Sequence, residues 1–147
     1  MSGTGTILEA MLHAGIDVAL VASDRRCRGL EIAEHAGIPA LLVDRVDYGG
    51  FSKSFDRDGY SEALTKVLQS NNIDLIAMAG FGTITSGIFH DAFPGRVLNT
   101  HPSLLPDFKG WHAAGGDGRA LRVQAERGGV VGFPRLDLRQ TVGDQCR

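Results

Sequence analysis

Residues 60–80 read YSEALTKVLQSNNIDLIAMAG and join a helical pattern directly to a strand pattern. Between Tyr60 and Leu68, hydrophobic side chains recur at positions i, i+3, i+4, i+7 and i+8, which predicts an amphipathic helix. The mainly apolar run over residues 74–79 ends at Gly80 and is typical of a strand buried on both faces of a sheet. A helix that leads into such a strand is half of a βαβ unit.

The same alternation continues on both sides of this segment and predicts an α/β fold with a Rossmann-like parallel sheet. Met1 stands directly on a glycine-rich turn of the kind that normally follows a strand. We therefore expect the first strand, which would lie in the middle of the sheet, to be missing, and the start site of the sequence to be assigned downstream of the true one. The other elements are predicted as helices over residues 7–12, 28–36 and 85–92 and as strands over residues 17–22, 39–43 and 96–98.

The chain has 147 residues, a formal net charge of −2 and two cysteines. Its length favours a single domain. The near-neutral charge argues against nucleic acid or a membrane surface as a partner, and no apolar run reaches the ~20 residues of a membrane span. Cys27 and Cys146 are too few and too far apart for a disulfide framework or a zinc site, which favours a cytoplasmic location.

Glycine is distributed unevenly along the chain. Of the 20 glycines, seven fall in residues 113–147, a segment that also has six arginines and no lysine. Apart from residues 119–126, which could form a helix, this segment has no helical or strand period. We expect an α/β domain over residues 1–112, incomplete at both ends, and an aberrant glycine- and arginine-rich tail over residues 113–147. A frameshift or disorder would explain the tail, and a genuine divergent tail is the alternative.

The first motif is SGTGT at residues 2–6, where the first predicted helix begins. Glycines at a helix entrance let a ligand approach the backbone closely, and the free N–H groups together with the helix dipole attract phosphate. This favours a phosphate site made by Gly5, Thr6 and Ile7. A tight turn with Thr4 or Thr6 as the helix N-cap is the structural alternative.

The second motif is NTHPSLLP at residues 99–106, after the last predicted strand. Open α/β sheets bind ligands at the carboxyl ends of their strands. In an extended segment Asn99 and His101 point to the same side, and Pro102 keeps His101 extended. An amide donor beside a histidine suits a reaction that builds an oxyanion and moves a proton. A purely structural His-Pro loop is the alternative.

Together with Ala79-Gly80-Phe81, the two motifs resemble those of the folate-dependent formyltransferases. The resemblance covers roughly residues 2–112 and is nearest to the members that act on glycinamide ribonucleotide. It implies an α/β fold of the formyltransferase type. It also implies transfer of a formyl group from 10-formyltetrahydrofolate to the amine of glycinamide ribonucleotide in purine synthesis, without a metal.

The resemblance gives both motifs a role in catalysis or binding. His101 would act as general acid and base, and Asn99 would contact the substrate and steady the oxyanion at the formyl carbon. The helix entrance would hold the phosphate of glycinamide ribonucleotide through Gly5, Thr6 and Ile7.

A folate site is implied in the same way. Arg57 matches an arginine near the folate, and the segment after Phe81 matches one that lines the pterin pocket through backbone groups. The family's arginine in this segment is replaced here by threonine, so we expect any contact of that side chain to be lost. The segment consists of Gly82, Thr83, Ile84 and Thr85.

One catalytic aspartate of the family has no counterpart, because Asp117, Asp137 and Asp144 stand in unsuitable contexts. A non-catalytic remnant that at most binds ribonucleotide phosphate is therefore one alternative. Another enzyme that uses formyltetrahydrofolate, either the deformylase or the methionyl-tRNA formyltransferase, is a second. The first of these normally carries an extra N-terminal domain and the second a basic C-terminal domain, neither of which has room in this chain.

The remaining polar and aromatic residues have structural interpretations. Residues 24–28, DRRCR, could hold an anion, but three arginines in a turn usually form a solvated face. Tyr48, Phe51 and Phe55 are expected to cover the edge of the core. Four histidines lack metal-ligand spacing and are expected on helix surfaces or in loops, namely His13, His35, His90 and His112.

Overall fold

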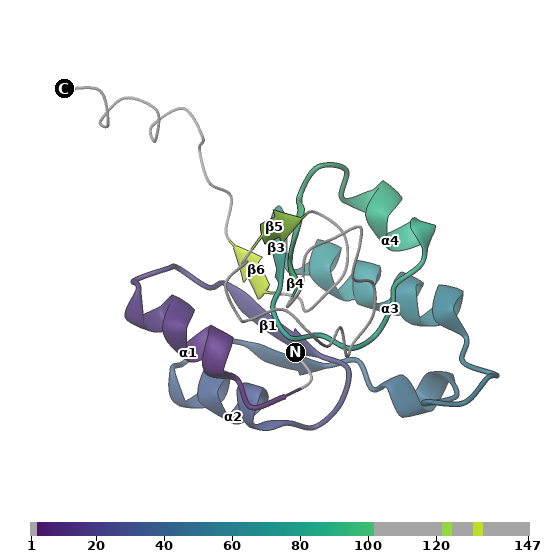
Figure 1. Ribbon diagram of the computed structural model, residues 1–147, viewed down its shortest axis with the longest axis horizontal. Coiled ribbons are helices and arrows are strands. Elements are labelled where there is room, and N and C mark those ends of the chain that lie inside the picture. The colour runs from purple at the N-terminus through teal and green to yellow at the C-terminus, as the bar shows by residue number, and fades with distance from the viewer. Residues whose placement is uncertain (1–2, 102–121, 125–130, 134–147) are drawn as a thin grey trace.

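The computed structural model describes residues 3–101, 122–124 and 131–133 (Figure 1). Helices and strands alternate along residues 6–101, as the sequence predicts. The helices are α1 (Thr6–His13), α2 (Arg28–His35), the 3₁₀ helix η1 (Arg45–Tyr48), α3 (Arg57–Ser70) and α4 (Gly87–Ala92). The strands are β1 (Leu20–Ser23), β2 (Ala40–Leu42), β3 (Leu75–Met78), β4 (Val97–His101), β5 (Arg122–Gln124) and β6 (Val131–Phe133).

The strands form a single sheet in the order β2-β1-β6-β3-β4-β5. β1 pairs with β2 in parallel, and β3 pairs with β4 in parallel. Because β6 is antiparallel to both β1 and β3, the strands β1 to β4 all run in the same direction. The predicted α/β class with a parallel sheet is confirmed, and the antiparallel strands β5 and β6 add to it.

Helices cover both faces of the sheet (Figure 1). In the layer of α1 and α2, Leu8 and Val21 belong to one buried core. In the layer of α3 and α4, Leu64 belongs to a second core together with Leu20 and Ala22. Successive residues of β1 therefore enter opposite cores, because side chains alternate between the two faces of a strand. The near-continuous apolar strands in the sequence are explained by this double coverage.

Two strands come from the segment in which the sequence shows no period. Residues 122–124, where a helix is the sequence-based alternative, form β5 beside β4, and residues 131–133 form β6 in the middle of the sheet. Without β6, facing backbone groups of β1 and β3 would lack partners, so even a three-residue strand is stabilised there. The rest of the predicted tail lies outside the described residues, and its boundary near residue 112 stays a prediction.

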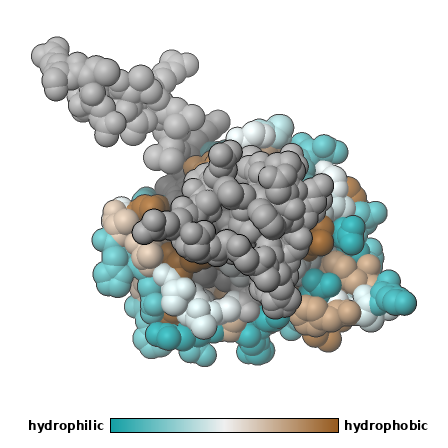
Figure 2. Space-filling view, viewed as in Figure 1, coloured by the Kyte–Doolittle hydropathy of each residue, from teal (hydrophilic) through white to brown (hydrophobic). Residues whose placement is uncertain are grey.

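On the face shown in Figure 2, hydrophilic and hydrophobic residues are interspersed. Phe51, expected to cover the core edge, is instead 73% exposed, whereas Tyr48 and Phe55 do pack against the core. Within the described ranges, no helix is long and apolar enough to cross a membrane.

Candidate functional site

The predicted phosphate, catalytic and folate residues lie toward one edge of the sheet. The parallel strands β1, β3 and β4 end there, and the segments that follow them leave the sheet at the same edge. α1 begins at this edge as well, because the Cδ1 atom of Ile7 lies 4.0 Å from the position that a Cβ on Gly80 would take. This edge is where open α/β sheets form their ligand sites.

A glycine occupies the N-cap position of α1. Gly5 is the N-cap residue, with φ of 79°, so neither Thr4 nor Thr6 caps the helix. A Cβ on Gly5 would lie 2.6 Å from Ile32 Cδ1, so the close contact of α1 with α2 requires glycine here. Thr6 and Ile7 are exposed in the first turn. First-turn N–H groups have no partner within a helix, which makes this end able to bind an anion.

Asn99 is buried in β4, beside Met78 of β3, with 1% of its surface exposed. Neither its Nδ2 nor its Oδ1 atom has a hydrogen-bond partner in the described part of the chain. A buried amide without partners costs about 1–3 kcal/mol of stability, so these two atoms call for a hydrogen-bonding group at this position. His101 lies two residues further, at the end of β4. Its side chain and residues 102–106 of the motif lie outside the described part.

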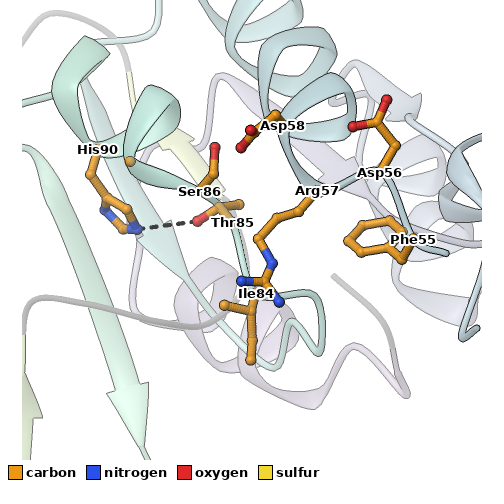
Figure 3. A pocket seen from close by; sticks show the side chains of 9 residues that line it. Phe55, Asp56, Arg57, Asp58, Ile84, Thr85, Ser86 and His90 are labelled. Carbon is orange, nitrogen blue, oxygen red and sulfur yellow. Dashed lines mark hydrogen bonds between the residues drawn. The ribbon is translucent and has the colours of Figure 1, made fainter. Parts of the chain in front are cut away.

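A pocket of about 630 Å³ opens between α3 and α4 (Figure 3). It brings together Arg57 at the start of α3 with Ile84 and Thr85, three of the five residues of the predicted folate site. Figure 3 shows the Arg57 side chain extending in the direction of Ile84. The residues that line the pocket are Phe55, Asp56, Arg57, Asp58, Ile84, Thr85, Ser86, Gly87 and His90.

His90 is a pocket residue that the sequence did not single out. It is half-buried on α4, and its Nε2 atom lies 3.2 Å from the hydroxyl of Thr85, at hydrogen-bond distance. The sequence gives only a weak indication of this contact. Thr85 lies before α4 and His90 lies within it, so no helical spacing relates the two residues. His90 thus lies on a helix, in agreement with the sequence, and in addition lines the pocket.

Thr83 directly precedes the pocket residue Ile84, and its role in the folate site stays a prediction. Among the described residues it does not line the pocket, but its side chain is 2% exposed and makes two hydrogen bonds. Its hydroxyl donates to Asp24 Oδ2 at 2.7 Å and accepts from Arg45 Nη1 at 2.9 Å. The Thr83 side chain therefore contacts protein groups, and the expected loss of the family's arginine contact at this position stays a prediction.

Residues 24–28 do not form a wholly solvated face, because Asp24 is completely buried. Arg25 donates to it through Nε at 3.0 Å and through Nη2 at 3.1 Å. The hydrogen bond to Asp24 raises the pKa of Arg25, whereas burial lowers the pKa of Arg45. No group of three potential metal ligands occurs in the described ranges.

Known proteins resemble this chain in both sequence and structure. The phosphoribosylglycinamide formyltransferase of Mycobacterium tuberculosis is 39% identical over 116 residues, which cover 76% of this chain and 51% of that protein. Glycinamide ribonucleotide transformylase 1 from Symbiobacterium toebii superposes with a TM-score of 0.65 at 41% identity, covering 77% of this chain and 54% of that one. The corresponding structure from Geobacillus kaustophilus gives 0.70 at 29% identity, covering 92% and 80%.

The chain spans about half the length of the first two of these proteins. The family model described as formyl transferase matches residues 1–131, which includes the helix entrance, the pocket and the strand that carries Asn99 and His101. On this match, and on the parallel sheet that it shares with the solved structures, the chain belongs to the formyl transferase family.

Proposed function

We propose that this chain transfers a formyl group from 10-formyltetrahydrofolate to the amine of glycinamide ribonucleotide. The observation that carries the proposal is the buried amide of Asn99, which has no hydrogen-bond partner among the described residues and lies at the edge of the sheet where α1 begins. The relatives named for glycinamide ribonucleotide, which is also called phosphoribosylglycinamide, support the same substrate. The reaction would belong to purine synthesis, in the cytoplasm.

The pocket suits a folate as the formyl donor. Its volume lies within the range of about 300–1,000 Å³ that small-molecule sites occupy. Ile84, 47% exposed, and the ring of Phe55 supply apolar surface for a flat heterocycle, and Thr85 with His90 supplies hydrogen-bonding groups. The guanidinium of Arg57 suits the carboxylates that a folate carries. The bound folate would supply the formyl group.

Different residues of the chain would bind the substrate, stabilise the oxyanion and transfer the proton. The N-terminal turn of α1, with Gly5, Thr6 and Ile7, would hold the phosphate of the ribonucleotide and so orient its amine. Asn99 would donate to the formyl oxygen as negative charge develops there. His101 would take the proton that the amine loses on forming the new C–N bond and deliver it to the folate nitrogen whose bond to the formyl carbon breaks.

The test is direct formyl transfer by the full 147-residue chain. With both substrates present, mass spectrometry should detect formylated ribonucleotide that gains one CO unit. His101→Ala should lower the rate by at least about 100-fold, the usual contribution of a general acid or base. Asn99→Ala should lower it by about 100- to 1,000-fold, the effect of removing an oxyanion donor.

Separate titrations distinguish the alternatives. The His101→Ala variant should still bind glycinamide ribonucleotide, because the phosphate site lies on α1. Binding of the ribonucleotide by the unchanged chain without any formyl transfer would overturn the proposal in favour of a non-catalytic protein. Release of formate without consumption of ribonucleotide would overturn it in favour of a deformylase.

A further inference from the structure

A partly buried network of side chains lies beside the pocket and links its two walls. One wall is residues 55–58, which lead into α3, and the other is residues 84–87 together with His90. Asp24 and Arg45 are not among the described residues that line the pocket. Arg45 contacts Phe55 of the first wall, and both Asp24 and Arg45 bind Thr83, the residue before Ile84 of the second wall.

The first link runs through Thr83, which directly precedes the wall residue Ile84. Residues 81–86 belong to no helix or strand, so no regular backbone ladder holds them in place. Instead, the Thr83 hydroxyl donates to buried Asp24 at 2.7 Å and accepts from Arg45 at 2.9 Å. Both bonds involve a charged partner, and such hydrogen bonds are the stronger kind.

The second link runs through the aromatic ring of Phe55, a residue of the opposite wall. The guanidinium carbon of Arg45 lies 4.1 Å from the centroid of the Phe55 ring and 4.5 Å from that of Phe51. A guanidinium over an aromatic face at this range is an attractive cation–π contact. One side chain, Arg45, therefore holds groups on both sides of the pocket.

Arg45 is itself fixed at its base. Its backbone N–H donates to the carbonyl oxygen of Asp24 at 2.9 Å, and its Nε atom donates to the carbonyl oxygen of Gly50. Because the backbone and the side chain are both anchored, the position of the guanidinium is set by β1 and the turn after η1 rather than by the pocket.

We propose that Arg45 is a positioning residue that sets the separation of the two pocket walls through Asp24, Thr83 and Phe55. These four residues are called the Arg45 bridge below. The bridge acts on the ligand of this pocket, which is a folate if the proposed function holds. Among the described residues, neither Thr83 nor Arg45 has a hydrogen bond or ring contact with α1, so we expect the bridge to affect the ligand of this pocket more than a ligand at the N-terminal turn of α1.

The experiment compares binding of folic acid with binding of glycinamide ribonucleotide to the full chain. Thr83→Val removes the hydroxyl and both of its hydrogen bonds with little change of shape. It should weaken folic acid about five- to tenfold, a loss equivalent to the net free energy of about one hydrogen bond. Arg45→Gln should weaken it by a similar factor. The dissociation constant of the ribonucleotide should stay within about twofold of its original value, because neither variant touches α1.

Two matched variants control for a general loss of structure. Thr83→Ser keeps the hydroxyl and should keep folic acid affinity. Arg96→Gln removes an arginine whose partner, Asp74, is a half-exposed carboxylate 3.1 Å away, and should leave both affinities unchanged. Equal weakening of both ligands by Thr83→Val and Arg45→Gln, or no weakening of folic acid, would overturn the bridge.

Hydrogen exchange of the backbone amides of residues 84–86 provides a measurement that needs no ligand. These amides should exchange faster in Thr83→Val than in Thr83→Ser, while those of β1 should not. If the unchanged chain does not bind folic acid, the proposed function fails. The hydrogen-exchange rates of residues 84–86 still test whether the Arg45 bridge holds this wall in place. Equal exchange in the two variants would overturn it.

Discussion

At the scale of single residues, Tyr60 combines complete burial with a hydroxyl that has no hydrogen-bond partner in the described part of the chain. Its ring packs against those of Tyr48, Phe55 and Phe81 at centroid distances of 5.6, 5.7 and 6.4 Å. Burial raises the pKa of the Tyr60 phenol above its ordinary value, and the nearby charge of Asp24 raises it further. The ring stabilises the core, whereas the hydroxyl does not.

Tyr60→Phe should therefore increase the free energy of unfolding by about 1 kcal/mol, because it removes only a hydroxyl that has no partner among the described residues. Urea denaturation at pH 7 measures the change. A decrease would show that the hydroxyl has a partner.

The same residue predicts a loss of stability in alkali. The pKa of Tyr60 is raised in the folded state, so the unfolded chain loses the phenol proton first. Its contribution to stability is constant below the ordinary tyrosine pKa of about 10 and falls as the pH rises above it. Urea midpoints at pH 9 and 11 should fall more steeply for the unchanged chain than for Tyr60→Phe, and parallel curves would contradict this.

Gly5 shows how one residue serves both packing and the candidate phosphate site. Gly5→Ala would place a Cβ 3.0 Å from Gly29 Cα in addition to the clash with Ile32, and would force alanine to a φ of 79°. The left-handed conformation alone costs about 1–2 kcal/mol. We expect a larger loss of stability than that, together with weaker binding of glycinamide ribonucleotide.

Gly15→Ala is the matched control for this change. Gly15 has a φ of 71°, but a Cβ there meets no atom within 4 Å. It should show the conformational cost without the packing cost and should not affect ribonucleotide binding. Equal urea midpoints for the two variants would mean that the contact between α1 and α2 contributes nothing.

At the scale of elements, α3 supports the larger core and one wall of the pocket at once. Leu64 and Leu68 are fully buried in the core, whereas Arg57 in the first turn lines the pocket. The N-terminus of α3 is also tied to the opposite wall, because the Ser86 N–H donates to Ser61 Oγ at 2.9 Å and Ser61 Oγ donates to the Arg57 carbonyl at 2.7 Å. The position of Arg57 therefore depends on how this helix begins.

Asp56 caps that helix, with Oδ1 accepting from the Gly59 N–H at 2.9 Å. Asp56→Ala should lower stability by about 1 kcal/mol, the usual contribution of an N-cap. Asp56→Asn removes the charge but keeps a capping oxygen, so it should cost much less. Thermal unfolding of the two variants side by side measures the difference, and an equal loss would assign the effect to charge rather than to the cap.

At the scale of the whole molecule, β6 joins two pairs of parallel strands into one sheet. Val131 stands opposite both Val21 of β1 and Ala77 of β3, and Gly132 stands opposite Leu20 and Ile76. The sheet between β1 and β3 therefore depends on three residues that are distant in the sequence.

Gly132→Pro should disrupt this junction, because proline has no N–H group and is poorly tolerated in a central strand. We expect a loss of more than about 1 kcal/mol, with faster hydrogen exchange in β1 and β3 and little change in α3. Urea denaturation and exchange measure the two effects. Unchanged exchange in β1 and β3 would show that β6 does not hold them together.

Much of the candidate site follows from local sequence. Polar residues that follow apolar strands predict the ligand edge, and the family resemblance extends this to Arg57, Ile84 and Thr85, which the structure brings into one pocket. The contacts of Thr83 and His90 depend on which residues reach them in space. No pattern near position 83 in the sequence predicts that Thr83 bonds to Asp24 and Arg45.

Apart from the 3₁₀ helix η1, the sequence by itself determined the order and kind of elements over residues 6–101, because helical and strand periods are local and repeat within a few residues. Only the tertiary structure decided that residues 131–133 form a central antiparallel strand and that Asp24 is buried. The physical reason is the same in both cases. A three-residue strand and a buried carboxylate are stabilised by partners supplied from elsewhere in the chain, and neither has a pattern of its own.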